Sequence, residues 1–223
     1  MLAIDLFCGL GGWTDGLLAE GYDVIGFDIE EHAYGDMRYP GKLVIQDVLT
    51  LHGSQFKDAA LIVASPPCQA YSYMAMPWKL AKAKAAAIRA DTTGESLVAL
   101  NRLFNACFRI QAEASLAAGR YIPLVVENVR GAEPWVGRSR WNFGSFYLWG
   151  DVPALMPSAI QSASVNGLKA AQDGLGGYGG NFGWNNTPMR RGNSKSAGRK
   201  AASAMIAKIP LILSRHIAAT YRA

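Results

Sequence analysis

Residues 2–12 read LAIDLFCGLGG, an apolar run that ends in a turn containing three glycines. We expect residues 2–7 to form a strand and residues 13–20 to form the helix that follows it. Glycine at a strand-to-helix turn tolerates positive φ and lets a ligand approach the backbone, at the sheet edge where open α/β folds bind ligands. The stretch therefore predicts a nucleotide-type site. The spacing is not that of the dinucleotide fingerprint, so an ordinary tight turn is the alternative.

The chain continues as alternating short apolar runs and helical stretches, which is typical of a parallel sheet built from strand-helix units. Four further strands are expected, at residues 23–27, 43–46, 60–64 and 122–126. Helices are expected at residues 80–90 and 97–118, and the aromatic run at residues 141–149 is a further strand candidate. These patterns predict an α/β fold.

The 223 residues, half of them hydrophobic, suffice for one core, so we expect a single domain over residues 1–223. Residues 158–198 are rich in Gly, Asn, Ser and Gln, which indicates a loop-rich insert over about residues 151–199. Two helical stretches follow, split at Pro210, and the second is expected at residues 210–222, packed on the core.

Three cysteines cannot all pair, and their spacing is not that of a metal site, so neither a disulfide framework nor a bound metal is expected. No apolar run reaches membrane-spanning length. These features predict a cytoplasmic protein that does not associate with membranes.

The positive charge is concentrated toward the C-terminal end of the sequence. The net charge is +5, but the last acidic residue is Asp173 and eight cations follow it. The first 173 residues hold 14 cations and 17 acids, a formal net charge of −3. This asymmetry favours a polyanionic partner, although a solvated basic tail is the alternative. The candidates for phosphate contacts are Arg190, Arg191, Lys195, Arg199 and Lys200.

Acids stand at the ends of the second and third expected strands. Asp28 closes the second strand and Asp47 follows the third. An acid after the second strand is where ribose hydroxyls are held in such sheets, and the next could accept a hydrogen bond from an adenine amine. Each could instead cap the helix that follows it.

Cys68 and Glu127 are the candidate reactive groups. Pro66 and Pro67 stiffen the loop after the fourth strand and remove two backbone donors, so Cys68 is expected to be presented rather than buried. A thiolate in such a setting is a strong nucleophile. Cys8 and Cys107 have ordinary structural explanations. Glu127 ends the fifth strand, so it is expected at the same sheet edge, with a structural ion pair as the alternative.

Three segments, in this order, resemble the DNA cytosine-5 methyltransferases. They are residues 5–12 (DLFCGLGG), residues 67–72 (PCQAYS) and residues 127–129 (ENV). The resemblance covers roughly the first 135 residues, and three ordered matches are far more specific than any one of them. It implies a Rossmann-like S-adenosylmethionine-dependent methyltransferase sheet with helices on both faces and a short recognition insert.

The resemblance also implies how a methyl donor would be held. S-adenosylmethionine would be bound along the sheet edge, with Asp28 on the ribose, Ile29 packed on the adenine, and Asp47 with Val48 at the adenine edge. The full set of residues implied for cofactor binding is Phe7, Gly9, Leu10, Gly11, Gly12, Asp28, Ile29, Asp47, Val48 and Pro66.

By the same resemblance, Cys68 would attack carbon 6 of a cytosine flipped out of DNA, and carbon 5 would then accept the methyl group. Glu127 would hydrogen-bond ring nitrogen 3 and the exocyclic amine of the base. Gln69 and Ser72 would contact the DNA. Arg140 is a partial candidate for the role of the family's Gln-x-Arg-x-Arg signature, which this sequence lacks.

The sequence departs from the family in two further places. The region available for target recognition is short, and Ile206-Ala207 stand where the family has a Gly-Asn pair before its last helix. The compact chain suits a monomeric, phage-encoded enzyme of the restriction-modification type. An RNA cytosine-5 methyltransferase and a catalytically silent nucleic-acid-binding module are the alternatives. An amino-methyltransferase is disfavoured because Cys68 stands where an aromatic residue would follow its prolines.

Overall fold

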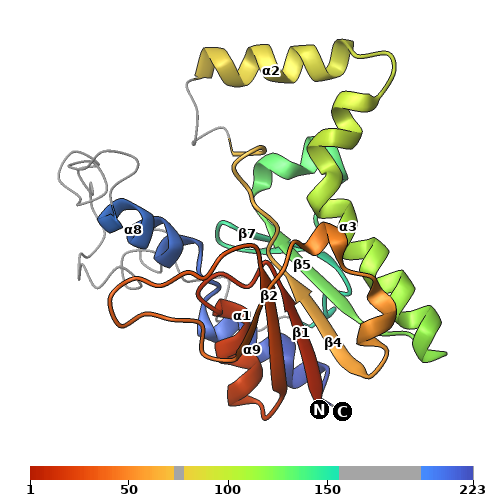
Figure 1. Cartoon of the computed structure of the whole chain (residues 1–223). Helices are drawn as coiled ribbons and strands as arrows, with labels where there is room; N and C mark the ends of the chain where they lie inside the picture. Colours follow the sequence, from red (N-terminus) through yellow and green to blue (C-terminus); the bar gives the residue numbers. More distant parts are fainter. Residues whose placement is uncertain (73–77, 156–196, 223) are drawn as a thin grey trace.

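The structure is a computed structural model that describes residues 1–72, 78–155 and 197–222 (Figure 1). Within these residues one seven-stranded sheet has the order β3-β2-β1-β4-β5-β7-β6. Its strands are β1 (Leu2–Leu6), β2 (Asp23–Asp28), β3 (Lys42–Ile45), β4 (Ala59–Ala64), β5 (Leu124–Asn128), β6 (Trp141–Phe143) and β7 (Phe146–Gly150). The first five are parallel, whereas β7 runs antiparallel to both β5 and β6.

The helices connect the strands and cover both faces of the sheet. They are α1 (Gly12–Ala19), α2 (Trp78–Ala90), α3 (Glu95–Ala118), α4 (Glu133–Val136), α8 (Ala197–Ala207) and α9 (Leu211–Thr220), with short 3-10 turns at η1 (Val48–Thr50), η2 (Gly53–Phe56) and η4 (Arg130–Ala132). The predicted α/β fold, a Rossmann-like sheet with helices on both faces, is confirmed.

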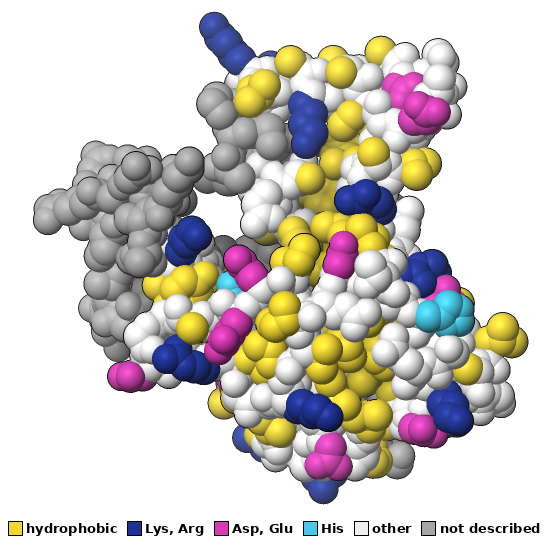
Figure 2. All heavy atoms as spheres, viewed as in Figure 1, with side chains coloured by type: hydrophobic (Ala, Val, Ile, Leu, Met, Phe, Trp, Pro, Cys, Tyr) yellow, Lys and Arg dark blue, Asp and Glu magenta, His cyan; other side chains and the backbone are white. Residues whose placement is uncertain are grey.

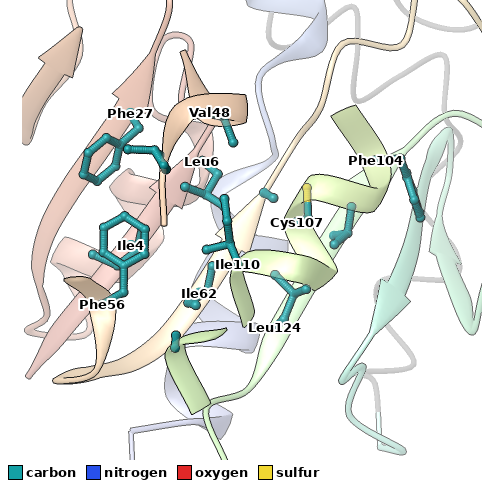
Figure 3. Close-up of a cluster of buried hydrophobic side chains, with 14 of the residues drawn as sticks. Ile4, Leu6, Phe27, Val48, Phe56, Ile62, Phe104, Cys107, Ile110 and Leu124 are labelled. Atoms are coloured by element: carbon teal, nitrogen blue, oxygen red, sulfur yellow. The ribbon is translucent and has the colours of Figure 1, made fainter. Parts of the chain in front are cut away.

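Two apolar clusters hold the layers together. On one face, α3 lays Cys107 and Ile110 against the sheet, beside Ile62 and Leu124 (Figure 3). On the other face, α1 and α9 cover the sheet with a second cluster, whose fully buried or nearly buried members include Trp13, Leu17, Val63, Leu213 and Ile217. The two faces are called below the α3 face and the α1 face.

Helix α9 lies directly on α1. Gly16 of α1 leaves no room for a side chain, because a Cβ at that position would meet Ser214 of α9. Tyr22, just after α1, donates a hydrogen bond to the carbonyl of Ala218 over 3.1 Å. The end of the described chain therefore covers the first helix.

The aromatic run that we expected as one strand is a hairpin. Residues 141–149 contain the turn between β6 and β7, with Gly144 at φ 57°. The side chain of Asn142 closes this turn by donating to the carbonyl of Gly144 over 3.0 Å. An Asn-x-Gly turn inside a mostly aromatic stretch was hidden by the strand propensity of its neighbours.

Helix α2 stands apart from the sheet and joins α3 at its N-terminal end (Figure 1). Only one of its faces is packed: Ala81 and Ala85 are buried, whereas the lysines between and around them are exposed. No helix in the described part of the chain is long and apolar enough to cross a membrane.

Candidate active site

The turn after β1 curls so that its backbone faces open space. Phe7 and Gly9 have φ values of 57° and 52°, and a Cβ on Gly9 would meet nothing within 4 Å. The amide of Cys8 donates to the carbonyl of Phe27, which ties the turn to β2. Gly9 is thus the point at which a ligand can reach the backbone.

Asp28 organises this turn from the end of β2. Its Oδ2 accepts the amide of Gly9 over 2.9 Å and its Oδ1 accepts the amide of Ile29 over 2.8 Å. His32 Nε2 lies 3.6 Å from Oδ1. Each carboxylate oxygen has two acceptor sites, so Asp28 can still accept a ligand hydroxyl after making these bonds. Asp28 can therefore cap the local backbone and bind a ligand hydroxyl at the same time.

The other glycines of the turn have packing roles. A Cβ on Gly11 would meet Pro40, and one on Gly12 would meet Ile209 just before α9. Leu10 is buried with 5 % of its surface exposed. Of the turn residues predicted to hold a cofactor, Gly9 faces open space, while Leu10, Gly11 and Gly12 are engaged by the protein itself.

The residues expected around an adenine follow β2 and β3. Ile29 exposes 69 % of its surface, a value that leaves an apolar face ready for a ring. Asp47 caps η1, since its Oδ1 accepts the amide of Leu49 over 2.9 Å. Val48 is 2 % exposed and its side chain belongs to the core, so only its backbone remains for a ligand.

A buried acid lies beneath the turn. Asp5 is fully buried; its Oδ2 accepts the Thr14 hydroxyl over 2.7 Å, and that hydroxyl also lies 2.7 Å from the Tyr39 hydroxyl. Asp5 Oδ1 is buried without a hydrogen-bond partner. Burial, with a smaller contribution from the nearby charge of Asp28, raises the pKa of Asp5 from 3.8 to about 8 against the lowering effect of the Thr14 hydrogen bond. The carboxyl group is therefore largely protonated at neutral pH.

The loop after β4 carries Cys68 to the same edge. Ser65 is held from two sides, because its amide donates to the carbonyl of Leu6 and its hydroxyl accepts the Trp13 indole N–H over 3.0 Å. Beyond Cys68 the chain turns tightly, with the amides of Tyr71 and Ser72 both donating to the Cys68 carbonyl over 2.9 Å. The Cys68 segment is thus anchored to the glycine turn.

The three cysteines differ in accessibility. Cys68 is half-buried, whereas Cys8 and Cys107 are buried. Burial raises the pKa of the Cys8 thiol, as do the charges of Asp5 and Asp28, and burial raises the pKa of the Cys107 thiol. Neither of these two thiols is suited to form a thiolate at neutral pH, which fits the structural roles predicted for them.

Asn128 joins the Cys68 loop to β5. Its side-chain Nδ2 donates to the carbonyl of Pro66 over 2.8 Å, and its Oδ1 accepts the amide of Val129 over 2.9 Å. Asn128 is 1 % exposed, and its neighbour Glu127 is 9 % exposed. Because Pro66 precedes Cys68 by two residues, this hydrogen bond brings the two predicted catalytic segments together at one point of the sheet edge.

The catalytic role predicted for Arg140 has no support in the geometry. Glu127 pairs with Leu148, and both alternate with residues of the α3 face, so the Glu127 side chain belongs to the α1 face. Arg140 instead lines a groove of about 390 Å³ on the α3 face with Phe104, Phe108 and Trp149. The sheet therefore lies between the side chains of Glu127 and Arg140. The β6–β7 hairpin, which was not predicted, determines that Arg140 lies on the α3 face.

The predicted nucleic-acid contacts are only partly described. Gln69 is exposed and Ser72 is half-buried, both beside Cys68. Arg190, Arg191 and Lys195 lie outside the described residues, and the backbone of Arg199 and Lys200 lies in the first turn of α8. Their role in binding phosphates stays a prediction, as does the insert over residues 151–199, most of which lies outside the described range.

Sequence reasoning missed the residues that connect the segments. Trp13, Ser65 and Asn128 received no role, although their hydrogen bonds assemble the site. Asn128 did carry a signal, since a buried-strand amide directly after Glu127 needs a partner and the proline-rich loop offers free carbonyls.

The arrangement fits an adenosyl cofactor beside a nucleophile. It combines an open glycine backbone, a carboxylate with acceptor capacity and an exposed aliphatic side chain, next to a half-buried cysteine. Among the described residues, no three or more His, Cys, Asp or Glu side chains are grouped to hold a metal ion.

Comparison with known proteins agrees with this arrangement. Residues 1–84 match the family model described as C-5 cytosine-specific DNA methylase. No curated protein matches the chain.

Several solved structures are similar. One, described as a candidate DNA modification methyltransferase encoded within an E. coli prophage, shares 20% identity with a TM-score of 0.44, over 75% of this chain and 54% of that one. The Dnmt2 methyltransferase of S. pombe shares 17% identity with a TM-score of 0.39, over 61% of this chain and 37% of that one. The Entamoeba histolytica methyltransferase EhMeth shares 18% identity with a TM-score of 0.36, over 61% and 40%.

The chain thus spans about half the length of the prophage protein. The match to the family model includes the glycine turn, both acids and the Cys68 loop. Residues 1–84 of the chain are thus similar to the C-5 cytosine-specific DNA methylases.

Proposed function

We propose that this protein transfers a methyl group from S-adenosylmethionine to carbon 5 of cytosine in DNA, through a covalent adduct on Cys68. The observation that carries the proposal is the hydrogen bond from Asn128 to Pro66, because it joins the cysteine loop to the strand that holds Glu127. A nucleophile and an acid at one sheet edge, beside a turn suited to an adenosyl group, are the parts that this reaction requires.

The cofactor-binding residues act by holding and orienting. Gly9 offers its open backbone, Asp28 accepts ribose hydroxyls, and Ile29 packs on the adenine. S-adenosylmethionine, when bound, supplies an electrophilic methyl group. The buried and largely protonated Asp5 under the turn keeps a second full negative charge away from the carboxylate of Asp28.

Cys68 and Glu127 activate the base. The Cys68 thiolate forms a bond to carbon 6 of the cytosine, and the electron pair of the carbon 5–carbon 6 double bond moves toward carbon 5 and the ring. Glu127 donates a proton to ring nitrogen 3 as negative charge develops there. Carbon 5 becomes nucleophilic and takes the methyl group. Loss of the proton from carbon 5 to water restores the double bond and expels the Cys68 thiolate, and nitrogen 3 returns its proton to Glu127.

The base must reach Cys68 from outside the double helix. An atom inside a stacked duplex is not accessible to a side chain at a sheet edge, so the cytosine has to be flipped out. Gln69 and Ser72, which flank the tight turn after Cys68, are the nearest described candidates to hold the displaced strand. The basic residues between 190 and 200 are proposed as further phosphate contacts.

The test is mechanism-based trapping. A DNA oligonucleotide with fluorine at carbon 5 of its cytosines cannot lose a proton after methyl transfer, so a stable protein–DNA complex should accumulate when S-adenosylmethionine is present. Cys68→Ser should abolish both the complex and turnover, whereas Cys107→Ser, the matched control, should retain both. Glu127→Gln should slow adduct formation more than it weakens DNA binding.

Mass spectrometry of the trapped peptide decides the outcome. A crosslink on Cys8 or Cys107, or efficient turnover by Cys68→Ser, would overturn the mechanism. The same oligonucleotide prepared as RNA tests the alternative substrate, since preferential trapping of RNA would replace DNA in the proposal.

A further inference from the structure

Helix α2 carries four cations and no acid: Lys79, Lys82, Lys84 and Arg89. All four side chains are exposed. The first 173 residues have a formal net charge of −3, so this local surplus contrasts with the rest of that part of the chain. Figure 2 shows Lys and Arg side chains over the α2 arm, with acidic side chains gathered where α2 turns into α3.

The inner face of α2 rests on segments that continue directly from the candidate active site. Ala81 and Ala85 are buried and share a small cavity with Ala70, two residues after Cys68, and with Trp135. The Arg89 guanidinium lies 5.1 Å from the centre of the Trp135 ring, a cation–π contact. Trp135 follows β5, the strand that ends with Glu127 and Asn128. Helix α2 therefore contacts both the segment after Cys68 and the segment after Glu127.

Lys79 and Lys82 lie away from this cavity, whereas Lys84 is one of its lining residues. Residues 81 and 85 lie on one side of the helix, so Lys79 and Lys82, three residues apart, form a stripe on the flank and outer side. From Lys79 to Arg89 the helix rises roughly 15 Å, which is enough to follow several consecutive phosphates of a nucleic-acid strand.

We propose that α2 binds the phosphate backbone of the DNA that presents its cytosine to Cys68, with Lys79 and Lys82 as the main contacts. The identity of this polyanion rests on the proposed function. DNA is the fitting occupant because α2 packs on Ala70 beside Cys68, so a polyanion lying along α2 continues past the nucleophile.

The experiment measures DNA binding without catalysis. Fluorescence anisotropy gives the affinity for a labelled duplex of about 20 base pairs, in the absence of cofactor, from about 50 to about 200 mM salt. Three proteins are compared: the wild type, Lys79→Gln/Lys82→Gln, and Lys42→Gln/Lys57→Gln. The last variant loses the same charge at the opposite edge of the sheet, where Lys42 begins β3 and Lys57 precedes β4, and both side chains are exposed.

The α2 variant should reduce the slope of log affinity against log salt by about 1.8, which is two phosphate contacts, and should weaken binding by roughly tenfold more at the low-salt end than at the high-salt end. The control should keep the wild-type slope. Thermal unfolding of all three proteins checks that the exposed substitutions leave the fold intact.

Two results separate this inference from the proposed function. If the fluorinated DNA is trapped but the α2 variant keeps the wild-type slope, α2 does not contact the backbone and the inference is wrong. If the slope falls only for the α2 variant but no adduct forms on Cys68, the inference holds and the catalytic proposal fails. A wild-type protein that binds no duplex would overturn both.

Discussion

The two halves of the sheet edge are assembled in different ways. Around β1 and β2, Asp28 receives the amides of Gly9 and Ile29, both supplied by backbone close to it in the fold. Around β4 and β5, a side-chain amide from Asn128 reaches the Pro66 carbonyl across 62 residues of sequence. The first half holds a ligand with backbone geometry, whereas the second positions a reactive group through tertiary contact. Substitutions should therefore affect affinity in one half and rate in the other.

Breaking the tertiary contact should have the largest effect. Asn128→Ala removes the donor to the buried Pro66 carbonyl, so the free energy of unfolding should fall by about 1–3 kcal/mol. Displacement of the Cys68 loop should lower kcat by about a hundredfold while the Kd for S-adenosylmethionine changes little. Single-turnover methylation and calorimetric cofactor binding measure the two quantities.

Asn142→Ala is the matched control for this substitution. Asn142 is exposed in the β6–β7 turn and donates to the Gly144 carbonyl, so its removal should leave kcat unchanged. A kcat for Asn128→Ala within twofold of the wild type would show that the hydrogen bond does not position Cys68.

The opposite pattern is expected for Asp28→Ala. This change removes an acceptor of the ribose hydroxyls, a charge-assisted bond worth about 1.5–3 kcal/mol, and should weaken S-adenosylmethionine binding roughly ten- to hundredfold. Asp23→Ala, at the exposed start of the same strand, should bind normally. Calorimetry on folded variants is the measurement, and equal affinities for both would remove Asp28 from the cofactor site.

The remaining expected effect concerns the acid beneath the glycine turn. Burial raises the pKa of Asp5 from 3.8 to about 8, so between these values the folded chain holds a proton that the unfolded chain releases. Its contribution to stability must then fall as pH rises through this window, by at most about 1.4 kcal/mol per pH unit, and no further loss occurs above about pH 8.

Asp5→Asn cannot titrate, so its free energy of unfolding should decline less between about pH 6 and about pH 8 than that of the wild type. Urea unfolding at both pH values provides the comparison. Asp23→Asn, an exposed acid on the neighbouring strand, should follow the wild-type profile. If Asp5→Asn also runs parallel to the wild type, Asp5 does not carry the proton.

The same contrast explains what could be predicted from sequence. The strand β1, its turn and α1 were predicted nearly to the residue because their pattern is local: an apolar run, three glycines and a helical stretch. The placement of Cys68 at the carboxyl edge followed from strand order in the same way. The role predicted for Gly11 and Gly12 in holding a ligand stays a prediction; a Cβ at these positions would meet Pro40 and Ile209, which only the folded chain brings near.

The sequence was least informative where a few residues decide which face of the sheet a side chain lies on or which residue it contacts. The turn at Gly144 splits an aromatic run into a hairpin, and the face of the sheet to which Arg140 belongs depends on that hairpin. The four cations of α2 do not stand out in the net charge of the sequence, because acids elsewhere in the first 173 residues outnumber the cations there. Hydrophobic periodicity and strand propensity do not reveal where such a turn falls or which face a side chain occupies.

The position of α9 against α1 has a consequence for biosynthesis. Trp13 and Leu17 are synthesised well before Leu213 and Ile217, yet the folded protein packs all four in one cluster. The Tyr22–Ala218 hydrogen bond joins residues 196 positions apart, and at typical elongation rates of about 5–20 residues per second the α1 face stays uncovered for roughly 10–40 s. During that interval the nascent chain exposes an indole and several aliphatic side chains that the folded protein buries.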